Sequence, residues 1–323
     1  MKPLIEVKDL HVSLQAQGEV IRAVRHVNFT LYEGERLGIV GESGCGKTIL
    51  MKSLLQLLPP AATVDSGEIW YQGTDLVKLS EKQLQKIRGK EIGMIFQDPM
   101  TSLNPTLKIG YQIAEGYLRH FPQVTKKEAD ARALELLKQV GIPDPELRLQ
   151  QYPHLLSGGM RQRAVIALAL AAKPSVLIAD EPTTALDVTI QAQILDLLHH
   201  LQKDMSTLLI THDLSLVAAF CDRVLVMYAG QIVEEAEVGE LFARPQHPYT
   251  QRLLQSIPRI DGKGEKLFPI AGSPPDLSAS LQGCAFCSRC TDAMNICRTE
   301  TPPLFELPSQ KTRCWLLDPR RKQ

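Results

Sequence analysis

The sequence predicts an α/β protein built around a mainly parallel β-sheet. Three features predict this class: a strand, a glycine-rich loop and a helix in series at residues 36–55, an apolar strand at 176–179 followed by two carboxylates, and alternating strand and helix patterns up to residue 221. Such alternation is typical of a parallel sheet covered by helices. With 323 residues and 44% hydrophobic content, the chain is long enough for two domains with a full core.

The hydrophobic pattern changes along the chain. Short alternating runs before residue 40 predict an antiparallel β subdomain, and a helical pattern between about 97 and 172 predicts a helical subdomain. Further elements are expected at 22–29, 67–71, 208–211, 223–228 and 231–234 (strands, the last two a closing hairpin) and at 129–140, 190–201 and 216–221 (helices).

The glycine-rich loop at residues 41–48 has the composition of a P-loop. Its candidate phosphate-binding residues are Gly41, Ser43, Gly44, Gly46, Lys47 and Thr48. Glycines let backbone N–H groups turn toward phosphate oxygens at a helix N-terminus. Lys47 supplies a cation for the β- and γ-phosphates, and Thr48 supplies a hydroxyl for Mg²⁺. The loop therefore predicts an ATP site.

Two carboxylates follow the apolar strand at residues 176–179. Asp180 ends the strand, where it can hold the water shell of Mg²⁺. The side chain of Glu181 points elsewhere, because successive residues of a strand face opposite sides. It is the candidate that orients or deprotonates the attacking water.

A second glycine-rich segment, residues 156–160, cannot form a P-loop of its own. Ser157 is expected to cap a helix that runs to Ala172 and is closed by Pro174. A capped helix start behind glycines can bind an anion. Since the P-loop already holds one nucleotide, this segment predicts a head-to-tail dimer with ATP sandwiched at each interface.

With these motifs in this order, residues 3–238 resemble an ABC-type ATP-binding cassette. The resemblance implies that Gln97 ligates Mg²⁺ and senses the membrane partner. It also implies that Ser157 and Gly159 bind the γ-phosphate of ATP held by the other subunit, and that His212 contacts the γ-phosphate and Glu181. The loop of residues 184–187 belongs to the same pattern.

Two positions depart from the family pattern. Met160 stands where the family has glutamine, which removes one polar contact and keeps the Ser-Gly-Gly core. Residues 14–21 contain no aromatic side chain to stack on adenine, so apolar contact from Val20 or Ile21 is expected instead.

The C-terminal part narrows the resemblance. Residues 244–250, 96–105 and 272–277 are similar to elements of dipeptide and oligopeptide ABC importers, in particular the first of their two ATPase subunits. The implied domains are a cassette at 1–239, with a helical subdomain at about 97–172, and an extension at 240–323. The implied function is ATP-driven import of dipeptides or oligopeptides across the cytoplasmic membrane. Uptake of nickel or of antimicrobial peptides is the alternative.

Five of the seven cysteines gather in the extension, and clustered cysteines in a cytosolic protein favour a metal site over disulfides. Spacing alone favours Cys284, Cys287 and Cys290, as in ferredoxins. The family resemblance implies a different set, Cys284, Cys290, Cys297 and Cys314, as ligands of a [4Fe–4S] cluster. Zn²⁺ is the alternative, since four thiolates also suit it. The ATP site is expected to tolerate cluster loss, because Lys47 is assigned to a separately folded core.

Charge and hydropathy limit the remaining classes. The formal net charge is +0, which argues against nucleic acid as a partner. The apolar run at 164–172 is too short to span a bilayer, and the N-terminus has no signal-peptide core. We expect a peripheral subunit on the cytoplasmic face of the inner membrane. Its partners are a paralogous ATPase, two transmembrane permeases and an extracytoplasmic peptide-binding protein. A soluble ABC ATPase acting on DNA or ribosomes, or a redox sensor with an attached ATPase, are the alternatives.

Overall fold

The computed structural model describes residues 2–16, 18–184, 186–201, 205–256, 270–279 and 281–322, without the side chains of 321 and 322. The chain divides into two compact units. The first unit contains Met1–Tyr32, Arg36–Lys78 and Ile210–Gln323, and the second contains Glu33–Glu35 and Leu79–Leu209. These units do not follow the division into 1–239 and 240–323, which stays a prediction.

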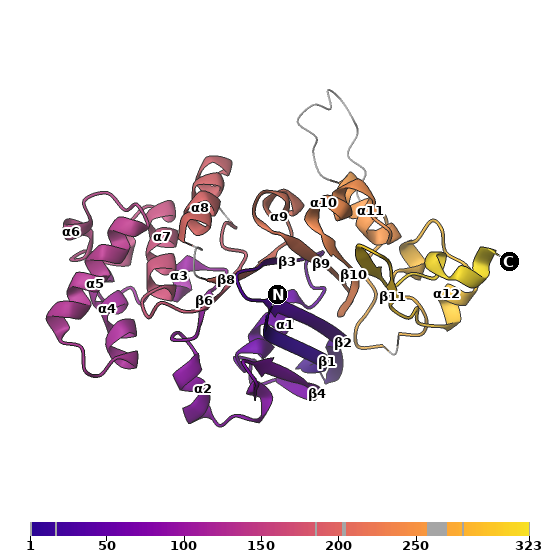
Figure 1. Cartoon of the computed structure of the whole chain (residues 1–323), viewed down its shortest axis with the longest axis horizontal. Helices are drawn as coiled ribbons and strands as arrows, with labels where there is room; N and C mark the ends of the chain where they lie inside the picture. Colours follow the sequence, from indigo (N-terminus) through magenta and orange to yellow (C-terminus); the bar gives the residue numbers. More distant parts are fainter. Residues whose placement is uncertain are drawn as a thin grey trace. The chain divides into compact units, whose positions relative to one another are not determined.

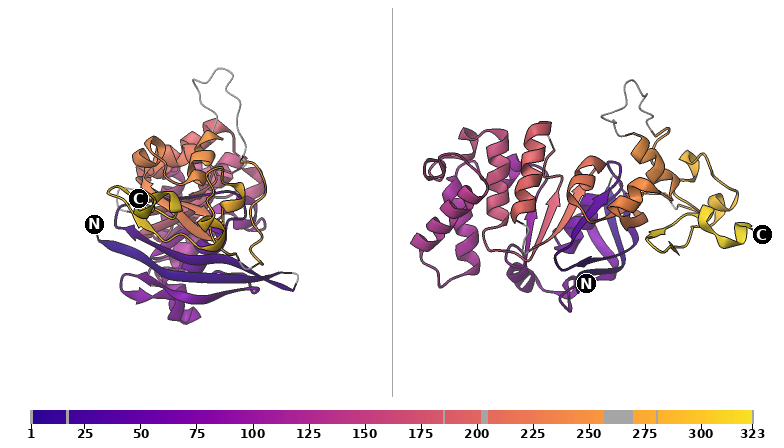
Figure 2. Two further views of the ribbon diagram at one scale, coloured as in Figure 1. Left: turned by 90° about the vertical axis from the view of Figure 1, so that its right-hand side faces the viewer. Right: turned by 45° about the horizontal axis from the view of Figure 1, so that its top comes forward.

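Two long strands open the first unit. β1 (Pro3–Ala16) pairs antiparallel with β2 (Glu19–Tyr32), and the two lie side by side in Figure 2. β1 also pairs antiparallel with β4 (Ala62–Tyr71), which continues to β5 (Thr74–Asp75). Alternate residues such as Leu10, Val12 and Val27 are fully buried, and each buried aliphatic side chain contributes roughly 1.5–3 kcal/mol. The predicted antiparallel β subdomain is confirmed.

A second sheet in the first unit leads to the P-loop (Figure 1). Its strands lie in the order β11 (Phe305–Glu306), β12 (Gln310–Thr312), β10 (Gln231–Glu237), β9 (Arg223–Tyr228) and β3 (Arg36–Val40). β3 and β9 are parallel, and β9 and β10 form the predicted antiparallel hairpin. β10 also pairs with β12, so a strand of the C-terminal extension joins this sheet.

The helices of the first unit follow strands or join them. They are α1 (Lys47–Leu54), α9 (Leu214–Phe220), α10 (Val238–Ala243), α11 (Pro248–Gln255) and α12 (Ile296–Thr299). No secondary structure was predicted from the sequence for the extension, and α10, α11 and α12 lie there or at its start. α11 is recognisable only from its capping residues, His247 and Pro248.

The second unit holds the predicted helical region and a smaller set of strands. β8 (Ser206–Thr211, of which residues 206–209 belong to this unit), β7 (Val176–Asp180) and β6 (Ile92–Ile95) lie in that order, and β6 and β7 are parallel. The helices are α2 (Glu81–Ile87), α3 (Pro99–Ser102), α4 (Ile109–His120), α5 (Lys126–Gln139), α6 (Pro145–Arg148), α7 (Gly158–Ala169) and α8 (Val188–Leu201). The parallel pairs and the helices between 97 and 172 confirm the predicted fold class.

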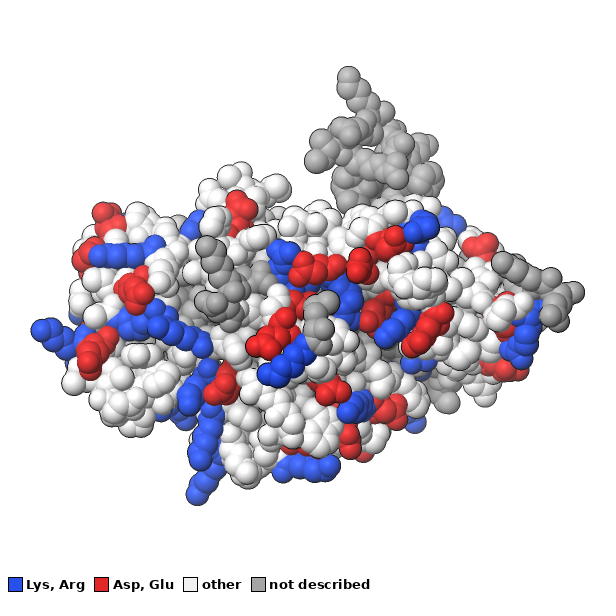
Figure 3. Space-filling view, in the orientation of Figure 1, with Lys and Arg blue, Asp and Glu red and all other residues white. Residues whose placement is uncertain are grey.

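The helix after Ser157 is shorter than the sequence predicted. It ends at Ala169, with Leu170 as its C-cap, and not at Ala172. Lys173 has a left-handed backbone (φ 56°), which cannot continue an α-helix, and Pro174 follows it. On the face drawn in Figure 3, basic and acidic side chains are interspersed, as the balanced composition leads one to expect.

Candidate ATP site and cysteine module

The P-loop has the predicted strand–loop–helix order in the first unit. β3 ends at Val40, and α1 begins at Lys47 with Gly46 as its N-cap (φ 105°). A side chain at position 46 would be strained, and its Cβ would lie 2.1 Å from the carbonyl oxygen of Ala23. Glycine at this position therefore lets the loop pack against β2 while its backbone faces the start of α1.

Lys47 lies inside the curve of the loop. Its Nζ donates to the carbonyl oxygens of Gly41 at 2.7 Å and Glu42 at 2.9 Å, and the residue is only 5% exposed. Ser43 and Gly44 are exposed beside it, and Thr48 is half-buried. A cation surrounded by backbone groups at a helix N-terminus is suited to bind phosphate.

The carboxylates in the second unit occupy the predicted strand end. Asp180 is the last residue of β7 and is 3% exposed. Glu181 follows with a left-handed backbone (φ 46°), which is costly for a residue other than glycine and often marks functional sites. Its Oε2 accepts hydrogen bonds from Gln97 Nε2 at 3.1 Å and Thr184 Oγ1 at 2.8 Å. The structure thus brings together Gln97 and Glu181, whose contact the sequence did not predict.

The capping prediction for the segment 156–160 is confirmed. Ser157 is the N-cap of α7, and its Oγ accepts a hydrogen bond from the Met160 N–H at 3.3 Å. Ser157 and Gly158 are exposed, and Gly159 is half-exposed beside Ile190. This helix start is therefore open to a ligand or partner.

His212 lies in the first unit, in the exposed turn between β8 and α9. The adjacent Asp213 caps α9 by accepting a hydrogen bond from the Ser215 N–H at 2.8 Å. The predicted contacts of His212 with Glu181 and a γ-phosphate stay predictions. In the loop 184–187, Ala185 lies outside the described residues.

The five C-terminal cysteines lie in residues 281–317, which we call the cysteine module. The Cys284 N–H donates to the Cys297 carbonyl at 2.8 Å, which joins the two ends of the segment that holds Cys287 and Cys290. Burial, together with the nearby thiols of Cys297, Cys314 and Cys290, raises the pKa of the Cys284 thiol to about 12. Burial likewise raises the pKa of Cys314 to about 11. Four thiols from distant positions therefore lie near one another.

Two residues of the extension that sequence analysis missed contact the P-loop. The Tyr249 hydroxyl accepts a hydrogen bond from the Glu42 N–H, and Arg289 forms an ion pair with the Glu42 carboxylate. These partners are 207 and 247 positions apart, and no local pattern reports such contacts. The P-loop and the module lie in one compact unit and contact each other through Glu42 and Arg289. The expectation that Lys47 belongs to a separately folded core stays a prediction.

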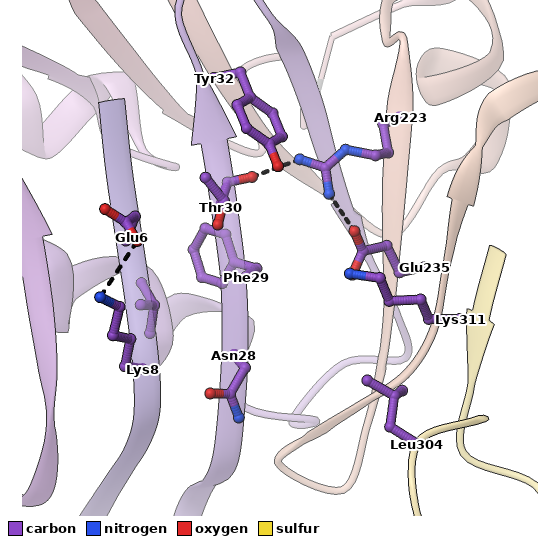
Figure 4. Close-up of a pocket in the computed structure, with 11 residues that line it drawn as sticks. Glu6, Lys8, Asn28, Phe29, Thr30, Tyr32, Arg223, Glu235, Leu304 and Lys311 are labelled. Atoms are coloured by element: carbon purple, nitrogen blue, oxygen red, sulfur yellow. Dashed lines mark hydrogen bonds and ion pairs between the residues drawn. The ribbon is translucent and has the colours of Figure 1, made fainter. Parts of the chain in front are cut away.

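Two other polar groupings in the first unit are not assigned to the site. In the pocket of Figure 4, Arg223 donates to Glu235, and Lys8 pairs with Glu6 at 3.3 Å, so these charged groups already have protein partners. Asp9, His11 and His26 hold ligand atoms within 4.8 Å of one another. Arg22 and Arg25 line the pocket beside these histidines, so the local charge is unfavourable for a metal cation and we assign none.

Comparisons with known proteins cover both parts of the chain. Residues 24–184 match the family model for ABC transporters, and residues 233–297 match the C-terminal region of oligopeptide/dipeptide transporters. The oligopeptide transport ATP-binding protein OppD of Bacillus subtilis is 55% identical over 98% of this chain and 89% of its own length. The dipeptide transport ATP-binding protein DppD of the same organism is 52% identical over 99% of this chain and 96% of its own.

Solved structures agree with the fold. The dimeric post-hydrolysis state of the ATP-binding cassette MJ0796, bound to ADP and Pi, gives a TM-score of 0.66 at 28% identity. The match covers 73% of this chain and 99% of that one. The cbiO1 structure from Clostridium perfringens gives a TM-score of 0.65 at 28% identity, over 76% of this chain and 92% of that one.

Proposed function

Because the chain belongs to the ABC transporter family, among the ATP-binding proteins of oligopeptide and dipeptide transport, we propose that it hydrolyses ATP to power peptide import. The observation that carries this proposal is the match of 52–55% identity over nearly the whole chain, cassette and extension alike. The comparisons give no specific support to nickel as the substrate. No helix among the described residues is long and apolar enough to cross a membrane.

In this proposal the P-loop binds the phosphates of ATP. Lys47 exchanges its hydrogen bonds to the carbonyl oxygens of Gly41 and Glu42 for contacts with the β- and γ-phosphates. The backbone N–H groups of Ser43, Gly44 and Gly46 donate hydrogen bonds to the phosphate oxygens. Thr48, Gln97 and Asp180 would hold Mg²⁺, which supplies positive charge to the transferred phosphoryl group.

Glu181 is the proposed general base. A base must lie within hydrogen-bond reach of the attacking water and keep a fixed orientation. The hydrogen bonds from Gln97 and Thr184 hold the Glu181 carboxylate in one orientation. His212 would contact the γ-phosphate and complete the catalytic group.

The exposed start of α7 is the proposed contact with a partner's nucleotide. Ser157 and Gly159 would bind the γ-phosphate of ATP held by a second, paralogous ATPase subunit in a head-to-tail arrangement. Two transmembrane permeases and an extracytoplasmic peptide-binding protein complete the proposed importer. The chain would then lie on the cytoplasmic face of the membrane.

We assign a [4Fe–4S] cluster to the cysteine module. Zn–S bonds of about 2.3 Å would bring four thiolates to within about 4 Å of one another. Among the described residues, no three cysteine sulfurs lie within 4.8 Å of one another. A cubane cluster holds its thiolates further apart, because each binds a different iron, so the donor set fits it better. Cys284, Cys290, Cys297 and Cys314 would hold the cluster.

Reconstituted transport tests the function. The chain would be reconstituted in vesicles with its partner ATPase, the permeases and the peptide-binding protein, and uptake of a radiolabelled tripeptide would be compared with uptake of ⁶³Ni²⁺. We expect ATP-dependent peptide uptake that Lys47→Ala abolishes, and little ATP hydrolysis by the chain alone. Uptake of Ni²⁺ without peptide would overturn the substrate, and full hydrolysis by a monomer would overturn the head-to-tail site.

A further inference from the structure

The guanidinium of Arg289 uses all five of its N–H groups. Arg289 ends a short 3₁₀ helix, Cys287–Arg289, and its side chain is only 3% exposed. Its hydrogen bonds run to Glu42 Oε2 (2.6 Å) and Oε1 (2.9 Å), Tyr228 Oη (3.3 Å), and the carbonyl oxygens of Ala271 (3.0 Å) and Ile270 (3.2 Å). Because the guanidinium is a rigid planar fork, five bonds fix its position and orientation.

The partner of this fork is the second residue of the P-loop. Glu42 is held at three points: its carboxylate by Arg289, its N–H by the Tyr249 hydroxyl at 2.9 Å, and its carbonyl oxygen by Lys47 Nζ at 2.9 Å. Burial raises the pKa of Tyr249, so its hydroxyl stays neutral. Two of these three contacts come from the C-terminal extension.

We propose that Arg289 is a positioning residue of the ATP site: it holds the P-loop through Glu42, so that ATP affinity depends on the folded cysteine module. The inference rests on the proposed role of the P-loop in ATP binding. Arg289 touches no phosphate in this proposal and acts only through Glu42.

Charge gives the contact a second effect. Glu42 places a carboxylate in a loop that must bind the polyanionic phosphates of ATP. Like charges repel, and the repulsion grows where protein excludes water. The bidentate pair cancels this charge, so the module both orients the loop and removes an obstacle to phosphate binding.

The module in turn holds Arg289 in place. Phe286 is 1% exposed and packs edge-on against Tyr228, with ring centroids 5.2 Å apart, and against Tyr249 at 5.4 Å. The Arg289 N–H donates to the Phe286 carbonyl at 3.0 Å, and Cys290 follows directly. A metal held by the module's cysteines would therefore fix the turn that carries Arg289.

Coupling of this kind acts in both directions. If the folded module strengthens ATP binding by some factor, ATP must stabilise the folded module by the same factor. The proposal can therefore be tested at the cysteines as well as at the nucleotide, independently of hydrolysis or transport.

The first test measures ATP affinity of the full chain by calorimetric titration, on variants whose circular dichroism matches that of the wild type. We expect Arg289→Gln to weaken binding about 10- to 100-fold, in the range typical of coupled sites. Arg289→Lys, which keeps the charge and loses the fork, should lie between. The control is Arg298→Gln, an exposed arginine beside Cys297, and it should bind as wild type. Unchanged affinity in folded Arg289→Gln would overturn the proposal, whereas no ATP binding by wild type would overturn the proposed function instead.

The second test measures alkylation of Cys287, a half-exposed thiol of the module outside the proposed ligand set, by mass spectrometry with and without saturating ATP. Reading Cys287 separately excludes direct protection of Cys45 in the P-loop. We expect ATP to slow alkylation of the module in wild type and in Arg298→Gln, and to have no effect in Arg289→Gln or Glu42→Gln. If ATP leaves the module's alkylation unchanged in wild type, or protects it equally in Arg289→Gln, the contact is structural only and the proposal is wrong.

Discussion

The start of α7 and the cysteine module are held by contacts of very different range. At α7, Ser157 accepts a hydrogen bond from Met160, three positions away. In the module, Arg289 pairs with Glu42, 247 positions away, and the Trp315 indole donates to the Glu300 carbonyl at 2.9 Å within the module itself. The first region is fixed by its own sequence, and the second depends on residues from the other end of the chain.

This difference in contact range determines which parts of the molecule a substitution affects. Losing an N-cap costs about 1 kcal/mol and affects one helix start. Removing one partner of the Arg289–Glu42 pair costs more, because the other charge is left without compensation; the cost reaches about 3–5 kcal/mol where a pair is fully buried, and this pair is part-buried. Substitutions at the start of α7 should therefore destabilise only that helix start. Substitutions in the module should also change the conformation of the P-loop.

The largest expected effect is a loss of ATP hydrolysis on substitution of Glu181 in the second unit. It tests whether a residue of that unit can be essential for hydrolysis and have no effect on the cysteine module. Glu181→Gln should reduce ATP hydrolysis by the assembled transporter about 10²- to 10⁴-fold, as expected for loss of a general base. ATP affinity and the metal content of the module should stay unchanged. Glu146→Gln, an exposed carboxylate of the same unit, is the control for turnover. Near wild-type turnover of Glu181→Gln would refute the assignment.

The next prediction concerns the module alone. Anaerobically purified protein should contain about four irons per chain and little zinc. Cys290→Ser and Cys314→Ser should lose the iron, since each leaves three native ligands, and Cys287→Ser should keep it. Elemental analysis and visible absorption measure the outcome.

Two results would change this assignment in different ways. One zinc and no iron in the wild type would replace the cluster with Zn²⁺. Iron lost from Cys287→Ser and kept in Cys314→Ser would retain the cluster and change its ligands.

The two regions also differ in how well the sequence predicted them. Ser157 and Glu181 were identified because a cap and a strand end are visible within a few residues. Neither the Arg289–Glu42 pair nor the pairing of β10 with β12 left such a signal, because each joins distant segments. The fold class and the motif residues were therefore predictable, and the support of the P-loop by the extension was not.

A smaller effect is the pH dependence of the free energy of unfolding that His247, a residue of the extension, is expected to cause. Complete burial lowers the pKa of His247 to about 3, against about 6.5 in an unfolded chain. Between these values the unfolded chain binds more protons, so the free energy of unfolding falls as pH falls below 6.5. At pH 4.5 the loss is about 2–3 kcal/mol.

Urea unfolding at pH 7 and pH 4.5 checks this prediction. His247→Asn should lose less stability between the two pH values, because Asn does not titrate and can still cap α11. His200→Asn, at an exposed position, should lose as much as wild type. An equal loss in His247→Asn would show that other groups cause the decline.

The smallest expected effect is at α7. Ser157→Ala removes the cap and should lower the free energy of unfolding by about 1 kcal/mol. Alkylation of the module should not change, because the damage is local. Faster alkylation in this variant would contradict the distinction between the two regions. Ser157→Asn, which restores a capping side chain, should recover the stability.

The pairing of β10 with β12 also has a consequence for synthesis of the protein. β10 ends at Glu237 and its partner begins at Gln310, so about 70 further residues must be translated before that edge can be covered. At elongation rates of roughly 5–20 residues per second, this takes several seconds. During that interval β10 presents unpaired backbone groups, which are a template for aggregation. A nascent chain stalled before residue 310 should therefore need a chaperone that a chain released after Thr312 does not.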